Sequence, residues 1–371
     1  MPLGRRQRVA TVGVAAVATA LALAACSSSS SSSTPASGGG GSTPAGGSSS
    51  SSAALSGTLN GSGSTFQTVF QQTAIASFKT VQSGMTINYG SGGSGKGRTD
   101  LASGVVNFAG SDSTIPAAET ANFKGKTVLY FPVVIGPITL SYNLSGLSKP
   151  LQLSAPVIAG IFDGKITKWN DPAIAADNSG VTLPSTAITI AVRSDSSGTT
   201  QNFTLFLKDA TPSTWTLGSS SIVKWPSTAR AGAGNSGVAQ IVKSTPGAIG
   251  YVDYATAKAS TLTFASVKNK DGDYVAPSPT SASAAAGQVT VAPDLTFHAV
   301  WAPGATSYPI TYQSWDLVYQ TQPNANDAAM LKAYIGYLLG AGQQLLPNLG
   351  YAPLPANIDQ MATAQLSKIG L

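Results

Sequence analysis

Hydrophobic positions in the chain follow two periods, one typical of strands and one typical of helices. Alternating or continuous apolar runs bounded by Gly and Asp indicate strands. These runs are "MTINYG" (85–90), "VVNFAGSD" (105–112), "VLYFPVVIGPITLSYNL" (128–144), "AITIAVRSD" (187–195) and "GAIGYVDYA" (247–255). Pro132 and Pro137 interrupt the longest run, which we still expect to be extended.

Helical spacing appears in two segments. The first contains Phe66, Val69, Phe70, Ala74 and Phe78. The second contains Met330, Leu331, Tyr334, Ile335, Leu338 and Leu339, and we expect Asp327 to cap it and Gly340 to end it. Strands interleaved with helices predict an α/β fold with mainly parallel sheets. Residues 268–288 are expected to form a surface hairpin and loop.

The N-terminal segment indicates export. Arg5, Arg6 and Arg8 precede an apolar run that ends in Leu-Ala-Ala-Cys at Cys26, the only cysteine of the chain. This pattern is typical of a signal peptide (residues 1–25), and its end resembles a bacterial lipobox, in which the cysteine is lipidated. Residues 27–52 are almost entirely Ser, Gly, Thr, Pro and Ala, a composition that cannot bury apolar surface. We expect residues 26–54 to tether a folded part to the membrane.

The folded part, roughly 320 residues long, is large for one hydrophobic core, so two lobes are expected. Without the three arginines of the signal, 18 basic and 15 acidic residues remain, a net charge of +3. There is no basic run that would indicate nucleic-acid binding. Glu119 is the only glutamate and His298 the only histidine. Paired-glutamate, histidine-triad and multi-histidine metal sites therefore lack their parts.

Three Gly- and Ser-rich loops carry the candidate chemistry: residues 61–65, 91–95 and 196–200. Glycine lets consecutive backbone N–H groups point at one spot, and Ser or Thr hydroxyls add neutral donors. The second loop nearly matches a nucleotide-binding P-loop, but Gly97 stands where the magnesium-binding Ser or Thr belongs. We interpret the three loops as converging on one small oxyanion.

Asp112 and Arg193 lie at the ends of predicted strands near these loops. Arg193 offers a forked pair of donors to an anion, and Asp195 is placed to hold its guanidinium. A carboxylate beside an anion is favourable only if the anion carries a proton, as monohydrogen phosphate does and sulfate does not. Asp112 is therefore a candidate acceptor for that proton, although a helix-capping role remains an alternative.

Several motifs resemble the phosphate-binding lipoprotein of the bacterial phosphate ABC transporter, the PstS family. They are "GSGSTF" (61–66), "INYGSGGSG" (87–95), "NFAGSDSTI" (107–115), "FPVVIGPITLSYNL" (131–144), "IFDGKITKWNDPAI" (161–174), "AVRSDSSGTTQNFTLFL" (191–207) and "GNSGVAQIVKSTPGAIGYVDYA" (234–255). The resemblance implies a two-lobed periplasmic-binding-protein fold of type II, with phosphate between the lobes. Residues 55–135 with 306–371 form lobe I, residues 136–305 form lobe II, and hinges are expected at 134–138 and 302–309.

The resemblance also implies site residues, carried over position by position. The phosphate-binding set is Thr65, Phe66, Ser94, Asp112, Arg193, Ser197, Gly198 and Thr199, with Asp195 as the salt-link partner of Arg193. Gln67, Lys96 and Pro137 depart from the family pattern, and none of them replaces a ligand. Lys96 is interpreted as a solvated side chain, with long-range attraction of the anion as the alternative.

These inferences describe a monomeric, extracytoplasmic lipoprotein that needs no cofactor or metal and is not an enzyme. It would capture inorganic phosphate and pass it to the permease and ATPase subunits of an ABC transporter. The alternative is an exported phosphatase with Ser94 or Ser197 as nucleophile and Asp112 as base. The same scaffold used for another tetrahedral anion, or purely for sensing and adhesion, is a third possibility.

Overall fold

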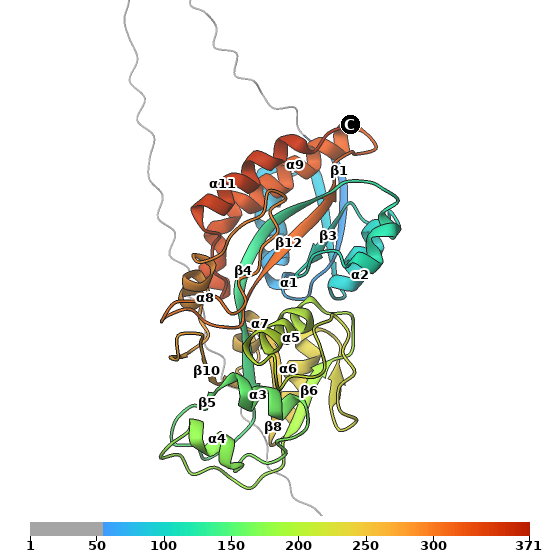
Figure 1. Ribbon diagram of the computed structural model, residues 1–371. Helices are drawn as coiled ribbons and strands as arrows, with labels where there is room; N and C mark the ends of the chain where they lie inside the picture. Colours follow the sequence, from blue (N-terminus) through green and yellow to red (C-terminus); the bar gives the residue numbers. More distant parts are fainter. Residues whose placement is uncertain (1–54) are drawn as a thin grey trace, which may run out of the picture. The chain divides into compact units, whose positions relative to one another are not determined.

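The computed structural model of the chain describes residues 55–371 (Figure 1). The predicted signal peptide, the lipidated Cys26 and the Ser/Gly-rich tether lie outside the described residues. Residues 55–371 belong to one compact unit. Among them, no helix is both long enough and apolar enough to span a bilayer.

A nine-stranded sheet runs through this unit in the order β2-β1-β3-β12-β4-β8-β6-β7, with β9 beside β4. Its first half consists of β1 (Gly57–Gly63), β2 (Met85–Ser91), β3 (Phe108–Ser111), β12 (Thr311–Tyr319) and the first part of β4 (Val128–Tyr142). β1 is parallel to β2 and β3, whereas β12 is antiparallel to β3 and β4. Its helices are α1 (Thr68–Val81), α2 (Ser94–Ala102), α9 (Ala325–Leu339), α10 (Leu346–Leu349) and α11 (Ala356–Gln365), with 3₁₀ turns at Ala117–Phe123, Ala341–Leu345 and Leu366–Lys368.

The second half of the sheet lies in the lower part of the molecule as drawn in Figure 1. It contains β8 (Ala248–Asp253), β6 (Thr189–Arg193), β7 (Arg230–Gly232) and β9 (Thr263–Phe264). β6 is parallel to both β7 and β8. The surrounding helices are α3 (Ala155–Phe162), α4 (Pro172–Asp177), α5 (Gly198–Ala210), α6 (Gly234–Ser244) and α7 (Tyr254–Ala259). A further helix, α8 (Pro279–Ala286), packs against β4 and β12. β5 (Gln152–Leu153), β10 (Ser266–Lys268) and β11 (Tyr274–Val275) make a small separate sheet.

The long strand β4 connects the two halves. Its first part pairs with β12 as far as Pro137, and from Ile138 onward it pairs with β8. The expected extended run is confirmed, and neither proline breaks it. Pro132 lies beside a register shift opposite Ser314 and Trp315, where the missing N–H costs no regular ladder bond. Pro137 lies where β4 exchanges one partner strand for the other.

Three details differ from the sequence-based expectations. The α/β class is confirmed, but the sheet is mixed, because β4 and β12 run antiparallel to their neighbours. Asn324, not Asp327, caps α9: the Asn324 side chain accepts a hydrogen bond from the Asp327 N–H. Residues 268–288 do contain a hairpin, but their second part is α8, whose Ser278 and Ser281 form a capping box.

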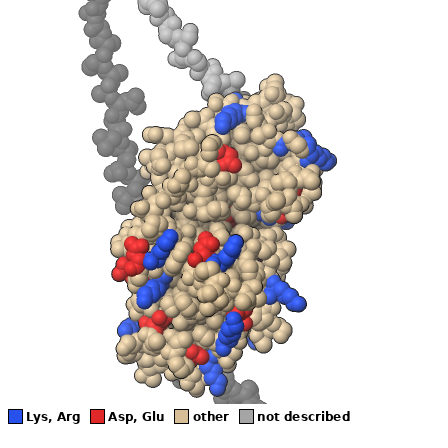
Figure 2. Space-filling model, viewed as in Figure 1, with Lys and Arg blue, Asp and Glu red and all other residues tan. Residues whose placement is uncertain are grey.

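Charged side chains are sparse on the surface. On the face in Figure 2, basic and acidic side chains are interspersed, and no continuous basic area is visible there. This distribution agrees with the absence of a basic run in the sequence and gives no electrostatic footprint for nucleic acid on that face.

Asp316 is a carboxylate buried completely inside the first half of the molecule. The Gln71 amide donates to both of its oxygens, at 3.2 and 3.1 Å. Burial nevertheless dominates and raises the pKa of Asp316 to about 7. The folded state therefore binds the Asp316 proton more tightly than the unfolded chain does. The stability that protonation of Asp316 contributes is fully present below about pH 4 and is lost as pH rises through 7.

We therefore expect Asp316→Asn to flatten the pH dependence of stability. Urea unfolding in phosphate-free buffer should show the unsubstituted protein losing ~2–4 kcal/mol relative to the variant between pH 4 and pH 8. Parallel pH curves for the two proteins would contradict this assignment.

Candidate functional site

The three Gly- and Ser-rich loops meet in the structure. The Gly92 and Gly93 N–H groups donate to the Gly63 carbonyl at 2.9 and 2.8 Å, which joins the first two loops. The Gly95 N–H donates to the Ser196 carbonyl at 3.0 Å, which joins the second loop to the third. Gly93 has φ of 89°, and a Cβ there would lie 2.3 Å from an Asp195 oxygen, so this close approach requires glycine.

Asp112 lies just after β3 at the centre of these loops and is 1% exposed. Its Oδ1 accepts from the Ser64 hydroxyl at 2.5 Å and from the Ser314 hydroxyl at 2.6 Å. Its Oδ2 accepts from the Ser94 hydroxyl at 3.3 Å. Burial raises the pKa of Asp112, and the serine donors together with Arg193 act in the opposite direction. One oxygen is thus firmly held, while the other has a single long contact.

Arg193 ends β6, and its side chain is only 1% exposed. Its Nε donates to Asp195 Oδ1 at 2.8 Å, and its Nη2 pairs with Asp195 Oδ2. Burial alone would raise the pKa of Asp195, but Arg193 outweighs burial and the pKa is lowered. The expected link between Arg193 and Asp195 is therefore present, and it fixes the plane of the guanidinium.

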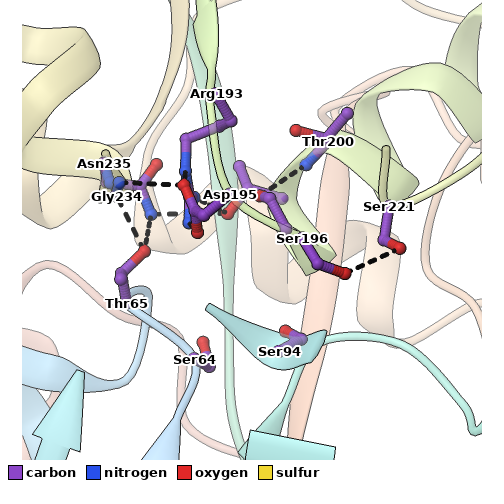
Figure 3. Close-up of polar contacts among 12 residues, drawn as sticks. Ser64, Thr65, Ser94, Arg193, Asp195, Ser196, Thr200, Ser221, Gly234 and Asn235 are labelled. Carbon is purple, nitrogen blue, oxygen red and sulfur yellow. Dashed lines mark hydrogen bonds and ion pairs between the residues drawn. The ribbon is translucent and has the colours of Figure 1, made fainter. Parts of the chain in front are cut away.

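Polar contacts also bridge from the first loop to the second half of the molecule (Figure 3). The Asn235 amide donates to the Thr65 hydroxyl oxygen at 3.0 Å and to the Thr199 hydroxyl oxygen at 3.3 Å. Arg193 Nη1 donates to the same Thr199 oxygen at 3.4 Å. Asn235, at the start of α6, was not predicted as a site residue.

The hydroxyls of Thr65, Thr199 and Ser197 share one property. Each accepts from a protein donor, and for Ser197 this donor is the Thr200 N–H at 3.1 Å, which caps α5. Among residues 55–371, none of the three has a carbonyl or carboxylate to which it donates. Their protons are therefore available to an anion.

The remaining predicted residues lie at the same place. A Cβ on Gly198 would lie 2.4 Å from Ser94 Oγ and 2.7 Å from Asp112 Oδ2, so α5 begins directly against Asp112. The Phe66 N–H donates to Ser64 Oγ at 3.1 Å. The other seven predicted residues therefore gather around Asp112 and Arg193, although the Phe66 N–H already has a protein partner.

Sequence reasoning missed several further contacts to Asp112, including those of Ser64, Ser314 and Asn202. Ser64 donates to it from within the recognised first loop, so composition alone was sufficient to suggest it. Ser314 lies in β12, and Asn202 in α5 donates to the Asp112 carbonyl at 2.7 Å. Neither Ser314 nor Asn202 stands in a Gly-rich pattern, and only the tertiary pairing brings them here.

Arg98 holds the segment around Asp112 from behind. It is 1% exposed, and its Nη1 donates to Ser113 Oγ at 2.9 Å and Ser111 Oγ at 3.3 Å. Its Nε and Nη2 donate to the Glu119 carboxylate at 2.6 and 3.0 Å. The only glutamate of the chain therefore has a structural partner and does not approach the site directly.

The second loop does not form a P-loop. Lys96 pairs with Asp100 at 2.7 Å, and its side chain is 56% exposed, which supports the solvated interpretation. A Cβ on Gly97 would lie 2.7 Å from Gly63 Cα, so α2 begins tightly packed against β1. Among residues 55–371, no group of three His, Cys, Asp or Glu residues is placed to hold a metal ion.

A pocket of about 250 Å³ opens beside the site. Thr65, Thr68, Asp195, Gly234 and Asn235 contribute to its lining. It therefore leads from the surface to the residues that bridge the two halves.

Comparison with known proteins gives a consistent result. Residues 48–341 match the family model of the PBP superfamily domain. The Phosphate-binding protein PstS 3 of Mycobacterium leprae is 35% identical over 310 residues, covering 80% of this chain and 83% of the relative. The Phosphate-binding protein PstS of Pasteurella multocida is 37% identical over 312 residues, covering 83% of this chain and 89% of the relative.

Solved structures show the same fold. The periplasmic phosphate-binding protein PfluDING, bound with phosphate, matches with a TM-score of 0.69 at 23% identity, covering 83% of this chain and 94% of that protein. A putative phosphate ABC transporter substrate-binding protein from Clostridium perfringens, with bound phosphate, has a TM-score of 0.59 at 16% identity, covering 81% and 100%. The expected two-lobed fold is thereby confirmed.

Proposed function

Because the chain belongs to the PstS family of phosphate-binding proteins, we propose that it captures inorganic phosphate outside the cytoplasmic membrane and delivers it to an ABC permease. No bond is made or broken in this role. The relatives are named for binding phosphate, and the site of this chain offers hydrogen-bond donors around one buried arginine.

The observation that carries the proposal is the placement of Asp112. A fully buried carboxylate beside the anion-binding donors is repulsive toward a bare oxyanion and favourable toward one that carries a proton. Among the described residues, Asp112 Oδ2 has only the 3.3 Å contact with Ser94, so it can accept the hydrogen of monohydrogen phosphate. Arg193 and the hydroxyls of Thr65, Ser197 and Thr199 then donate to the other oxygens.

Capture is proposed to involve closure of two lobes. Residues 134–138 are the first hinge, where β4 exchanges its β12 partner for β8, and residues 302–309, which lead into β12, are the second. Bonds such as Gly95 N–H to Ser196 and Asn235 to Thr65 hold the lobes together in the closed arrangement. Phosphate favours this state in proportion to its differential affinity for it.

Attachment and partners complete the proposal. Cys26 carries the lipid that anchors the chain on the extracytoplasmic side, and residues 27–54 provide the tether. The folded part acts as a monomer and meets the permease and ATPase subunits at the membrane. Its bound anion needs no cofactor.

Isothermal titration with phosphate, sulfate and arsenate tests the proposed ligand. We expect one phosphate per chain, comparable binding of arsenate, which also carries a proton near pH 7, and rejection of sulfate by about 10⁴ or more. A chromogenic phosphate ester should show no turnover, which separates a binding protein from a phosphatase. Equal affinity for sulfate and phosphate, or steady ester hydrolysis, would contradict the proposal.

A further inference from the structure

The Tyr312 hydroxyl is a buried polar group without an assigned role. Tyr312 is completely buried, and its hydroxyl has no hydrogen-bond partner among residues 55–371. Buried polar groups are almost always paired with protein, water or ligand, so an unpaired hydroxyl beside a binding site points to a missing partner.

The position of Tyr312 directs it toward the anion site. On β12 it precedes Ser314 by two residues, and side chains two apart on a strand share one face. The Ser314 hydroxyl on this face donates to Asp112 at 2.6 Å. The Tyr312 ring stacks on Phe66 with a centroid distance of 4.1 Å and an interplanar angle of 28°, which places it directly behind the first loop.

The charges around Tyr312 favour a donor role. Burial raises the pKa of Tyr312 well above its ordinary value, and the carboxylates of Asp112 and Asp253 raise it further. The phenol is therefore protonated throughout the physiological range. The Thr199 hydroxyl, a predicted phosphate contact, lowers the pKa of Tyr312 as a nearby side-chain donor would, but the two hydroxyls do not meet the geometry of a hydrogen bond, which leaves the Tyr312 hydroxyl unpaired within residues 55–371.

We propose that Tyr312 donates a hydrogen bond to the bound phosphate, an inference that rests on the proposed function. It would be a neutral donor contributed by β12, in addition to the loop residues carried over from the family. The stack on Phe66 fixes the ring, so the hydroxyl is preorganised and need not be ordered when the anion enters. The Tyr312 hydroxyl would donate to a phosphate oxygen that carries no proton, whereas Asp112 accepts from the oxygen that carries one.

One alternative partner is present in the site. Asp253 is completely buried, and its Oδ2 also has no partner within residues 55–371. If Tyr312 served Asp253 instead, loss of the hydroxyl would affect the ligand-free protein and leave phosphate binding unchanged. The two roles can therefore be separated by measuring stability and affinity together.

Tyr312→Phe tests the inference, because it removes the hydroxyl and retains the stacked ring. Titration with inorganic phosphate should give a Kd about 10- to 100-fold weaker, as expected for a hydrogen bond to a charged group, with the melting temperature of the ligand-free protein unchanged or slightly higher. Phosphate should also perturb the tyrosine ultraviolet spectrum of the unsubstituted protein, and this change should be reduced in the variant.

Tyr334→Phe is the matched control. Tyr334 is equally buried and lies outside both proposed hinges, but its hydroxyl donates to the Gln71 side-chain oxygen at 2.6 Å, so its loss should lower stability and spare phosphate affinity. A Kd for Tyr312→Phe within twofold of the unsubstituted protein would overturn the inference, with or without a loss of stability. If the unsubstituted protein itself failed to bind phosphate, the proposed function would be the part that is wrong.

Discussion

Replacing Arg193 with leucine is expected to weaken phosphate binding by about 10²- to 10⁴-fold, because removing one member of a buried, hydrogen-bonded charge pair costs roughly 2–5 kcal/mol or more. The Arg193 side chain is 1% exposed and supplies the fixed positive charge beside Asp112. Without it, a buried anion would face Asp112 and Asp195 with neutral donors alone. Isothermal titration with phosphate measures the loss.

Three further variants separate charge from geometry. Arg193→Lys keeps the charge but loses the forked pair of donors toward Asp195. Its phosphate affinity should therefore lie between those of the unsubstituted protein and Arg193→Leu. Arg230→Leu removes the same charge from exposed β7 and should change the affinity little. In the double variant Arg193→Leu with Asp195→Asn, part of the affinity should return, since no unpaired carboxylate remains. A Kd for Arg193→Leu close to that of Arg230→Leu would contradict the central role of Arg193.

The parts of the site that sequence reasoning located are those built from local chemistry. Glycine at positions 92, 93, 95 and 198 reflects close backbone approach, and this requirement is visible as composition. Asp195 follows Arg193 by two positions just after a strand end, so their pairing needs no knowledge of the fold. Family resemblance then supplied the roles of individual donors.

What sequence reasoning missed depends on contacts between distant segments. Ser314 reaches Asp112 across 202 positions because β12 inserts between β3 and β4, and nothing in "TYQSWDLVY" indicates that pairing. Asn235 bridges Thr65 and Thr199 only because the two halves of the molecule are apposed. The mixed sheet was missed for the same reason, since strand direction follows from topology and not from periodicity.

Asp112→Asn is expected to remove most of the discrimination against sulfate. The direction follows from which oxygen of Asp112 the protein holds. Oδ1 accepts from two hydroxyls, Ser64 at 2.5 Å and Ser314 at 2.6 Å. An asparagine at this position should therefore keep its oxygen on these two donors, which leaves its NH₂ group in the place of Oδ2.

That substitution converts an acceptor into a donor at the point where the phosphate proton is proposed to bind. Sulfate, which has no proton, would then gain a hydrogen bond instead of facing an unpaired buried charge. Phosphate can turn an unprotonated oxygen toward the NH₂ group, so its own affinity should fall only about tenfold. Since a hydrogen-bonded site rejects an analogue that lacks the bond by about 10⁴ or more, the phosphate-to-sulfate ratio should fall by at least ~10²-fold.

Competitive titration with the two anions measures this ratio directly. Asp316→Asn is the matched control, because it makes the same chemical change in a second buried carboxylate. Asp316 lies on β12, and Gln71 holds it in place of the serines that hold Asp112. The control should alter the pH dependence of stability and leave the phosphate-to-sulfate ratio intact, whereas Asp112→Asn should lower that ratio. If Asp112→Asn retained full rejection of sulfate, selectivity would have to arise from the donors around Arg193, and the proton-acceptor role of Asp112 would be wrong.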